Sequence, residues 1–159
     1  MEMSILPCEI RCAYGDEWQD AMALAWRTFL KFEAGDYPME GVRNFNNFIT
    51  DSGLYYMFSI GEYQLYLALD QKKIVGLISL RNVSHISLLF VEEAYHKKGI
   101  ATALVTYLVE LLKKNDGISR ITVNSSPYAV GFYHRVGFTD LGPETKKDGI
   151  IYTPMELLF

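Results

Sequence analysis

The stretch Val91–Thr102 runs directly from an apolar segment through a short basic loop into an amphipathic segment. A helix N-terminus leaves its first backbone N–H groups unpaired and carries about half a positive charge, so a loop that opens onto one is suited to bind an anion such as a phosphate. Gly99 and Ala101 lack bulky side chains, which lets the backbone approach a ligand closely. His96–Lys98 adds hydrogen-bond donors. These residues indicate a phosphate-binding turn; an ordinary strand-to-helix turn with solvated lysines is the alternative.

The loop resembles the pyrophosphate-binding loop of the GNAT superfamily of N-acetyltransferases, which usually reads Arg or Gln, two residues, Gly, one residue, then Gly or Ala. Gly99 and Ala101 fit this form. His96 departs from it at the first position, and Lys97 stands where a small residue is common. A second cofactor motif of the superfamily is matched at Ala129, Phe132-Tyr133 and Gly137-Phe138. The resemblance covers the chain from about residue 74 to its C-terminus.

The resemblance implies acetyl-CoA as the cosubstrate and no metal. The residues that it assigns to cofactor binding are Phe90, Val91, His96, Lys97, Lys98, Gly99, Ile100, Ala101, Thr102, Asn124, Ser126 and Tyr133. Family members often carry asparagine at the position of Ser126, and a serine side chain reaches less far toward the cofactor.

The catalytic role falls to Tyr133, which matches the tyrosine that the superfamily places beside the thioester sulfur. An amine that attacks a thioester has to lose a proton, and the departing sulfur benefits from a proton donor. We therefore expect Tyr133 to protonate the thiolate; a core tyrosine with a satisfied hydroxyl is the alternative. A backbone N–H near Phe90 or Val91 is expected to stabilise the oxyanion.

The residue that takes the proton from the amine is left open. His85 has a suitable pKa class, although a lone histidine at a strand start is more often structural or exposed. Glu33, Asp36 and Glu40 sit at the junction of the first two predicted helices, in a region that borders the acceptor site in the superfamily. Any one of them is more often a surface charge than a base, and a water relay would also serve.

Aromatic residues are dense in the N-terminal half, and the ones nearest these carboxylates are Phe29, Phe32, Tyr37 and Phe45. They are typical of an ordinary core, or else of an aromatic-lined acceptor cleft. Together with the acidic cluster they favour a cationic amine that carries apolar bulk.

Composition limits the remaining classes. The chain has 159 residues, half of them hydrophobic, which is typical of one domain, residues 1–159, with a substantial core. A net charge of −4 argues against a nucleic-acid partner. No run of about 18 apolar residues and no signal-peptide pattern is present, so we expect no membrane association and a cytoplasmic protein. A homodimer is left open.

Cys8 and Cys12, about 13 Å apart on a strand, are too distant for a disulfide.

The elements that position the loop follow from hydrophobic periodicity. Strands are predicted at 9–13, 64–69, 74–80, 85–91, 120–124 and 150–159, the last with Pro154 at an edge or bulge. Helices are predicted at 16–32 with Asp16 as cap, at 39–50 ended by Gly53, at 98–115, and from Ser126-Pro127 to Gly137. Residues 54–60 stay unassigned.

The helix at 98–115 connects strands 85–91 and 120–124, so these two strands are predicted to be parallel, with Val91 beside Asn124. The resemblance implies that the same strands splay apart where the pantetheine arm enters. The fold class expected is α/β (α+β): a GNAT-like, mixed, mostly antiparallel twisted sheet with helices on both faces.

The expected function is transfer of an acetyl group from acetyl-CoA to a primary amine of a small molecule or peptide by direct attack. A non-catalytic acyl-CoA-binding regulatory domain is the alternative from another class. A nucleotide-dependent phosphotransferase fits less well, because the loop lacks a Gly-Lys-Ser/Thr ending.

Overall fold

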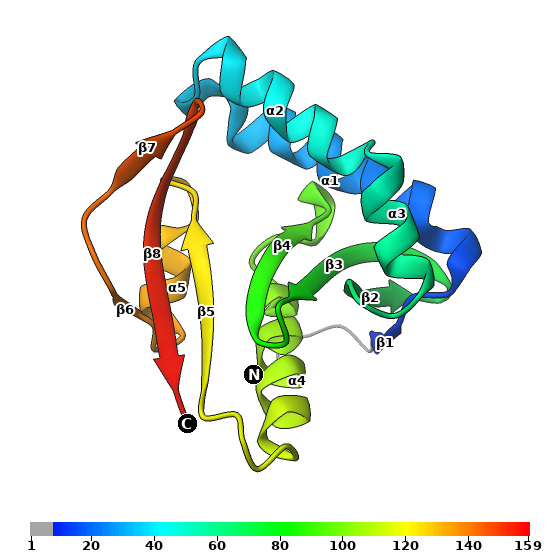
Figure 1. Cartoon of the computed structure of the whole chain (residues 1–159). Coiled ribbons are helices and arrows are strands. Elements are labelled where there is room, and N and C mark those ends of the chain that lie inside the picture. The colour runs from blue at the N-terminus through cyan, green and yellow to red at the C-terminus, as the bar shows by residue number, and fades with distance from the viewer. Residues whose placement is uncertain (1–7) are drawn as a thin grey trace.

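The computed structural model describes residues 8–159, and its strands form an eight-stranded sheet flanked by helices (Figure 1). The strand order is β1-β2-β3-β4-β5-β8-β6, and β7 pairs with β8. The strands are β1 (Glu9–Cys12), β2 (Gln64–Asp70), β3 (Lys73–Arg81), β4 (His85–Val91), β5 (Arg120–Ser125), β6 (Thr139–Asp140), β7 (Thr145–Lys147) and β8 (Ile150–Leu158). The helices are α1 (Trp18–Phe32), α2 (Met39–Ile49), α3 (Ser52–Ser59), α4 (Ile100–Lys113) and α5 (Val130–Arg135).

Two groups of buried side chains place helices on both faces of the sheet. One group joins α4 and α5 to the sheet and includes Leu104, Leu108, Ile121 and Tyr133. The other joins α1 and α2 to the opposite face and includes Leu24, Phe29, Ile49 and Leu88. Along β2, neighbouring residues contribute to the two groups in turn, because successive side chains of a strand point to opposite faces. The expected fold class is confirmed.

Tight turns join β2, β3 and β4 into the predicted antiparallel meander. Two residues of each connection have a positive φ: 50° and 74° at Gln71-Lys72, which form a two-residue turn, and 52° and 72° at Asn82-Val83, in the three-residue connection Asn82–Ser84. A two-residue turn with positive φ at both positions matches the right-handed twist of the strands. Val83 is unusual there, because a β-branched residue pays a steric cost in the left-handed region.

The strands β4 and β5 are parallel, as predicted, but they pair only where His85–Ile86 faces Thr122–Val123. Beyond these residues the two strands diverge (Figure 1). The expectation that Val91 lies beside Asn124 is therefore wrong, because the pairing ends long before β4 does. The splay that the family resemblance implied is present.

Two predicted helix starts are wrong. Asp16 does not cap α1, because a 3₁₀ turn at Gly15–Glu17 precedes the helix; the Glu17 carboxylate instead accepts a hydrogen bond from the Tyr14 amide at 2.7 Å. The α5 helix begins at Val130 and not at Ser126-Pro127, since residues 126–129 form a separate turn closed by the Ala129 amide and the Ser126 carbonyl at 3.1 Å.

Two further assignments change. Residues 54–60, unassigned from the sequence, mostly belong to α3, whose first turn is capped by the carboxylate of Asp51. Gly53 consequently lies inside α3 and does not end α2. Pro154 is in a strand with neighbours on both sides, but it falls in the gap between the short strands β7 and β6. Its missing N–H therefore costs no ladder bond.

The α2 helix rests on the tip of the β7–β8 hairpin, as Figure 1 shows. Gly41 and Gly149 bring the two backbones into contact: a Cβ added at Gly41 would overlap the carbonyl of Gly149. The amide of the Asn44 side chain donates to the Asp148 carbonyl at 2.7 Å. This contact ties the C-terminal hairpin to the N-terminal helices.

Candidate active site

The divergence of β4 and β5 opens a cavity of about 150 Å³. Its walls come from β4, β5 and β8, from α1 and α2 on one face of the sheet, and from α5 on the other. The lining residues that carry polar or aromatic groups of interest are Glu33, Tyr37, Phe90, Asn124, Ser126 and Tyr133. The fold thus brings four of the expected site residues into one cavity, together with a carboxylate.

Tyr133 is buried, with 3% of its surface exposed, between the aromatic rings of Phe132 and Phe138. The ring centroids lie 5.2 and 5.1 Å away in edge-on arrangements, which fix the plane of the tyrosine ring. Burial, and secondarily the charge of Glu33, raise the pKa of the Tyr133 hydroxyl above its ordinary value. The hydroxyl therefore stays protonated at neutral pH and can act as a donor.

The free edge of β4 presents backbone groups to this opening. A register shift in the β3–β4 pairing leaves Ser87 without a partner, which is a β-bulge. Beyond it, the Glu92 amide donates to the Val75 carbonyl of β3 at 2.8 Å. Because backbone groups alternate in direction along a strand, Leu89 and Val91 then point theirs away from β3, toward the opening. The Val91 amide is therefore better placed than the Phe90 amide to donate a hydrogen bond into the opening.

The loop before α4 has the backbone of an anion site. Gly99 has φ 84° and directly precedes the helix, and Lys97 is also left-handed at φ 62°. Because the backbone at Lys97 is left-handed, the GNAT pattern's preference for a small side chain at the position of Lys97 has a physical reason. The first intrahelical bond runs from the Ala103 amide to the Gly99 carbonyl, 2.9 Å. The amides of Ile100–Thr102 consequently have no acceptor within the helix.

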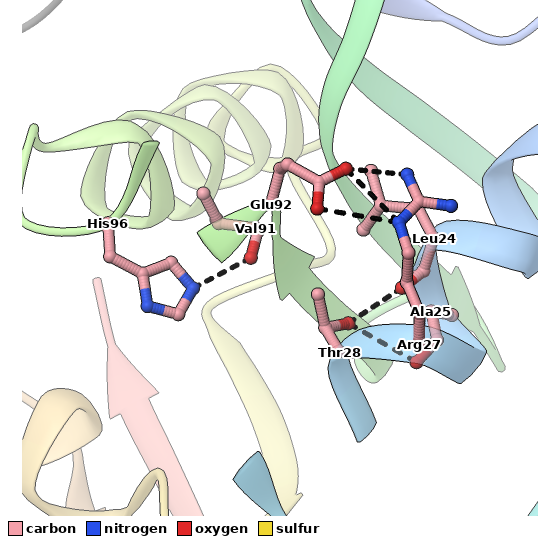
Figure 2. Close-up of polar contacts among 7 residues, drawn as sticks. All are labelled: Leu24, Ala25, Arg27, Thr28, Val91, Glu92 and His96. Atoms are coloured by element: carbon pink, nitrogen blue, oxygen red, sulfur yellow. Dashed lines mark hydrogen bonds and ion pairs between the residues drawn. The ribbon is translucent and has the colours of Figure 1, made fainter. Parts of the chain in front are cut away.

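His96 folds back on the end of β4, as Figure 2 shows. Its Nε2 lies 2.7 Å from the Val91 carbonyl oxygen. The imidazole also packs on Phe32, with ring centroids 4.8 Å apart, and Phe32 packs in turn on Tyr128 at 5.5 Å. Three segments thus meet beside the opening: the end of α1, the loop before α4 and the turn after β5.

Two ion pairs tie the same loop to α1. Arg27 forms a forked pair with Glu92, drawn in Figure 2, with Nε 3.2 Å from Oε1. One helical turn later, the Lys31 ammonium lies 3.3 Å from the Glu93 carboxylate. Both pairs are partly exposed, so they orient the loop more than they stabilise the fold.

Glu33 follows directly after α1 and lines the cavity. Burial raises the pKa of its carboxyl to about 7; the nearby Ser126 hydroxyl opposes this rise, and the charge of Asp36 adds to it. Burial and the charge of Glu33 also raise the pKa of Tyr37, and Ser126 again opposes the rise. The Ser126 side chain therefore faces these two residues of the α1–α2 connection. Sequence reasoning named Glu33 and Ser126 separately; only the fold joins them.

The other base candidates lie differently. His85 is at the paired end of β4, with Nδ1 2.8 Å from the Thr122 hydroxyl oxygen. Burial, with a smaller contribution from Arg81, lowers its pKa. Asp36 and Glu40 are exposed and are not part of the cavity wall.

Aromatic rings form one wall of the cavity. Phe29 stacks between Phe45 and Tyr37, with centroids 4.1 and 5.6 Å away. Phe32, expected with them, packs on the loop before α4 instead. The cavity lining also includes Tyr152 of β8, which hydrophobic alternation alone did not single out.

Within residues 8–159, no group of three or more His, Cys, Asp or Glu side chains is arranged to hold a metal ion. None of the helices in this part of the chain has the length and apolar character needed to cross a membrane. Cys8 and Cys12 are both free thiols, as expected.

Comparisons with known proteins agree with this geometry. The fold matches a GCN5-related N-acetyltransferase from Rhodopseudomonas palustris with a TM-score of 0.84 and 22% identity, over 100% of this chain and 99% of that one. It also matches the PaiA N-acetyltransferase from Thermoplasma acidophilum in complex with coenzyme A, with a TM-score of 0.79 and 19% identity, over 97% of this chain and 100% of that one. At these identities the likeness establishes the fold.

A candidate acetyltransferase of Bacillus subtilis (strain 168) is 31% identical over 98 residues, which are 60% of this chain and 66% of that protein. The model of a family described as "Acetyltransferase (GNAT) domain" matches residues 33–159. This match starts at the cavity carboxylate and includes the β4 edge, the loop before α4 and Tyr133. The chain accordingly belongs to the GNAT family of acetyltransferases, enzymes that transfer an acetyl group from acetyl-CoA.

Proposed function

We propose that this chain transfers the acetyl group of acetyl-CoA to a primary amine of a small molecule or peptide by direct attack. The observation that carries the proposal is that the cavity is lined from both faces of the sheet, by Phe29 and Phe45 on one and by Ala129 and Tyr133 on the other. Two substrates can therefore reach one point from opposite sides, which direct transfer requires.

The residues on the cofactor side fit acetyl-CoA. The amides of Ile100–Thr102, together with the left-handed Gly99, suit a pyrophosphate, and Lys97 and Lys98 add positive charge. The backbone of Leu89 and Val91 offers strand-like hydrogen bonds to an extended arm such as pantetheine. When bound, acetyl-CoA supplies an activated acetyl group.

Tyr133 is proposed as the proton donor to the departing sulfur. Its raised pKa keeps the hydroxyl protonated, and its ring is held by two edge-on aromatic contacts. The Val91 amide, which faces the opening, is proposed to stabilise negative charge on the acetyl oxygen. Hydrogen-bond donors fixed in place before the reaction need no reorganisation during it.

The acceptor is proposed to be a cationic amine with apolar bulk. Phe29, Tyr37 and Phe45 supply flat apolar surface, and Glu33 places a carboxylate among them. The exposed Asp36 and Glu40 add negative charge near this connection. An ammonium group close to such rings gains about 0.5–2 kcal/mol from cation–π attraction.

The test is turnover of an amine panel, read as release of free thiol from acetyl-CoA, with wild type and Tyr133→Phe. The substitution keeps the ring and its packing, so acetyl-CoA affinity should hold while kcat falls by roughly 10²–10⁴-fold. Tyr107→Phe is the matched control, because Tyr107 packs on Tyr66 away from the cavity. Undiminished turnover in Tyr133→Phe would remove that residue from the chemistry.

The second candidate, a regulatory domain that binds acyl-CoA without turnover, is favoured if wild type binds acetyl-CoA but acetylates nothing in the panel. The cytoplasmic location and the homodimer remain predictions.

A further inference from the structure

Glu33 occupies a position that costs stability. It is the C-cap residue of α1, and its amide donates to the Phe29 carbonyl at 2.9 Å. A helix C-terminus carries partial negative charge and favours lysine or arginine over a carboxylate. The side chain is moreover partly withdrawn from water at the cavity wall. Neither feature stabilises the fold, and the structure shows no cation paired with Glu33 among the described residues.

We propose that Glu33 is the general base that takes a proton from the acceptor ammonium, and that Ser126 positions it. This inference rests on the proposed function. Glu33 lines the same cavity as Tyr133, the proposed acid, but comes from the opposite face of the sheet. An acceptor amine that enters past the α1–α2 connection meets Glu33 before it meets the acetyl group.

The proton balance assigns each group one task. Glu33 takes one proton from the ammonium, and the freed lone pair of the nitrogen forms the C–N bond. The C–S bond breaks with its electron pair on sulfur, which receives the Tyr133 proton. The second nitrogen proton restores the Tyr133 hydroxyl. One proton is released overall, and Glu33 passes it to solvent.

The surroundings of Glu33 tune it for this task. The titratable groups that face it are Asp36 and Tyr37 from the α1–α2 connection, Tyr128 from the turn after β5, and Tyr133 from α5. All are neutral or negative at neutral pH, so none opposes the effect of burial, which raises the Glu33 pKa to about 7. A base is most effective when its pKa lies near the working pH.

Ser126 lines the same cavity as Glu33 and opposes this rise, and its Oγ accepts a hydrogen bond from the Ala129 amide at 3.3 Å. The serine is therefore held by the turn after β5 while it orients a group from α1. This arrangement assigns to Ser126 a task on the acceptor side, whereas the family resemblance assigned it a cofactor contact.

The experiment compares kcat/KM for the amine against pH in wild type, Glu33→Gln and Ser126→Ala, with Glu110→Gln as a matched surface control. Wild type and control should lose activity below an apparent pKa near 7. Glu33→Gln should lose that acid limb and fall by roughly 10²–10⁴-fold. Ser126→Ala should move the limb to higher pH, because the carboxylate loses the hydroxyl that favours its charged form, and this shift separates positioning from simple packing.

Thermal unfolding supplies a readout independent of activity. Since the folded pKa of Glu33 is raised above that of the unfolded chain, its contribution to stability is present below about pH 4.5 and is lost as the pH rises through about 7. Glu33→Gln removes this loss, so its Tm relative to wild type should rise between about pH 5 and pH 8. A Glu33→Gln enzyme that keeps the acid limb overturns the assignment while the proposed function stands. A wild-type enzyme that acetylates no amine overturns both.

Discussion

Replacing Gly41 with alanine should separate α2 from the β7–β8 hairpin. A Cβ at this position would lie 2.9 Å from the carbonyl carbon of Gly149 and closer still to its oxygen. Heavy atoms in contact are more than about 3 Å apart, so the overlap with the Gly149 oxygen requires the helix or the hairpin to move by at least about 1 Å. Overpacking of this kind costs about 1–3 kcal/mol. Loss of the bond from Asn44 to Asp148 adds about 0.5–1.5 kcal/mol.

The sum is about 1.5–4.5 kcal/mol, which at about 2–4 °C per kcal/mol for a chain of this length lowers Tm by about 3–18 °C. Differential scanning calorimetry measures this fall, and Gly35→Ala is the matched control, since a Cβ at Gly35 meets nothing within 4 Å. Because α2 and β8 both line the cavity, KM for the amine should rise while acetyl-CoA affinity stays constant. If Gly41→Ala unfolds at the same temperature as Gly35→Ala, the two backbones are not in contact as described.

Two other substitutions test the backbone. Gly99→Val places a β-branched residue at φ 84°, where only glycine is unstrained, so calorimetry should find acetyl-CoA binding abolished while circular dichroism shows a folded protein. Gly117→Val, where a Cβ meets nothing within 4 Å, is the control, and unchanged affinity in Gly99→Val would contradict the loop assignment. Val83→Gly relieves left-handed strain in an exposed turn and should raise the free energy of unfolding by about 0.5–1 kcal/mol, with a smaller gain for Val83→Ala. If Val83→Gly is no more stable than wild type, the turn is unstrained.

Much of the fold could be predicted because its elements have strong local patterns. The run His85–Val91 was located to the residue, and the helix after it within two residues at each end. The prediction failed at a helix boundary where two neighbouring residues could each satisfy the first backbone amides. Asp16 is a residue type that suits an N-cap, but the Glu17 carboxylate accepts the hydrogen bond from the Tyr14 amide, and a 3₁₀ turn precedes the helix. Local propensity does not decide between two such neighbours.

In the candidate site, too, some residues could be predicted from local motifs, whereas one contact between distant residues could not. Gly99 and Tyr133 stand in short motifs whose spacing a sequence displays directly. Glu33 and Ser126 are far apart in the sequence, and their proximity in the cavity depends on how far β4 and β5 diverge, which no local pattern encodes. One signal was present: a glutamate just before the helix-breaking segment 35–38, where the helix dipole favours a basic residue.

The junction between β4 and β5 also bears on how the molecule folds. With only two paired positions across it, the ladder of backbone hydrogen bonds is nearly divided into a block of β1–β4 and a block of β5–β8. The strands β2, β3 and β4 are antiparallel neighbours joined by short turns, so this part of the first block can form early with little loss of chain entropy, whereas β1 joins it across the three N-terminal helices. The blocks are then joined by the α4 crossover and by the hairpin contact at Gly149. A ligand that fills the opening contacts both β4 and β5, which line it, so native-state hydrogen exchange should change from two opening units to one when it binds.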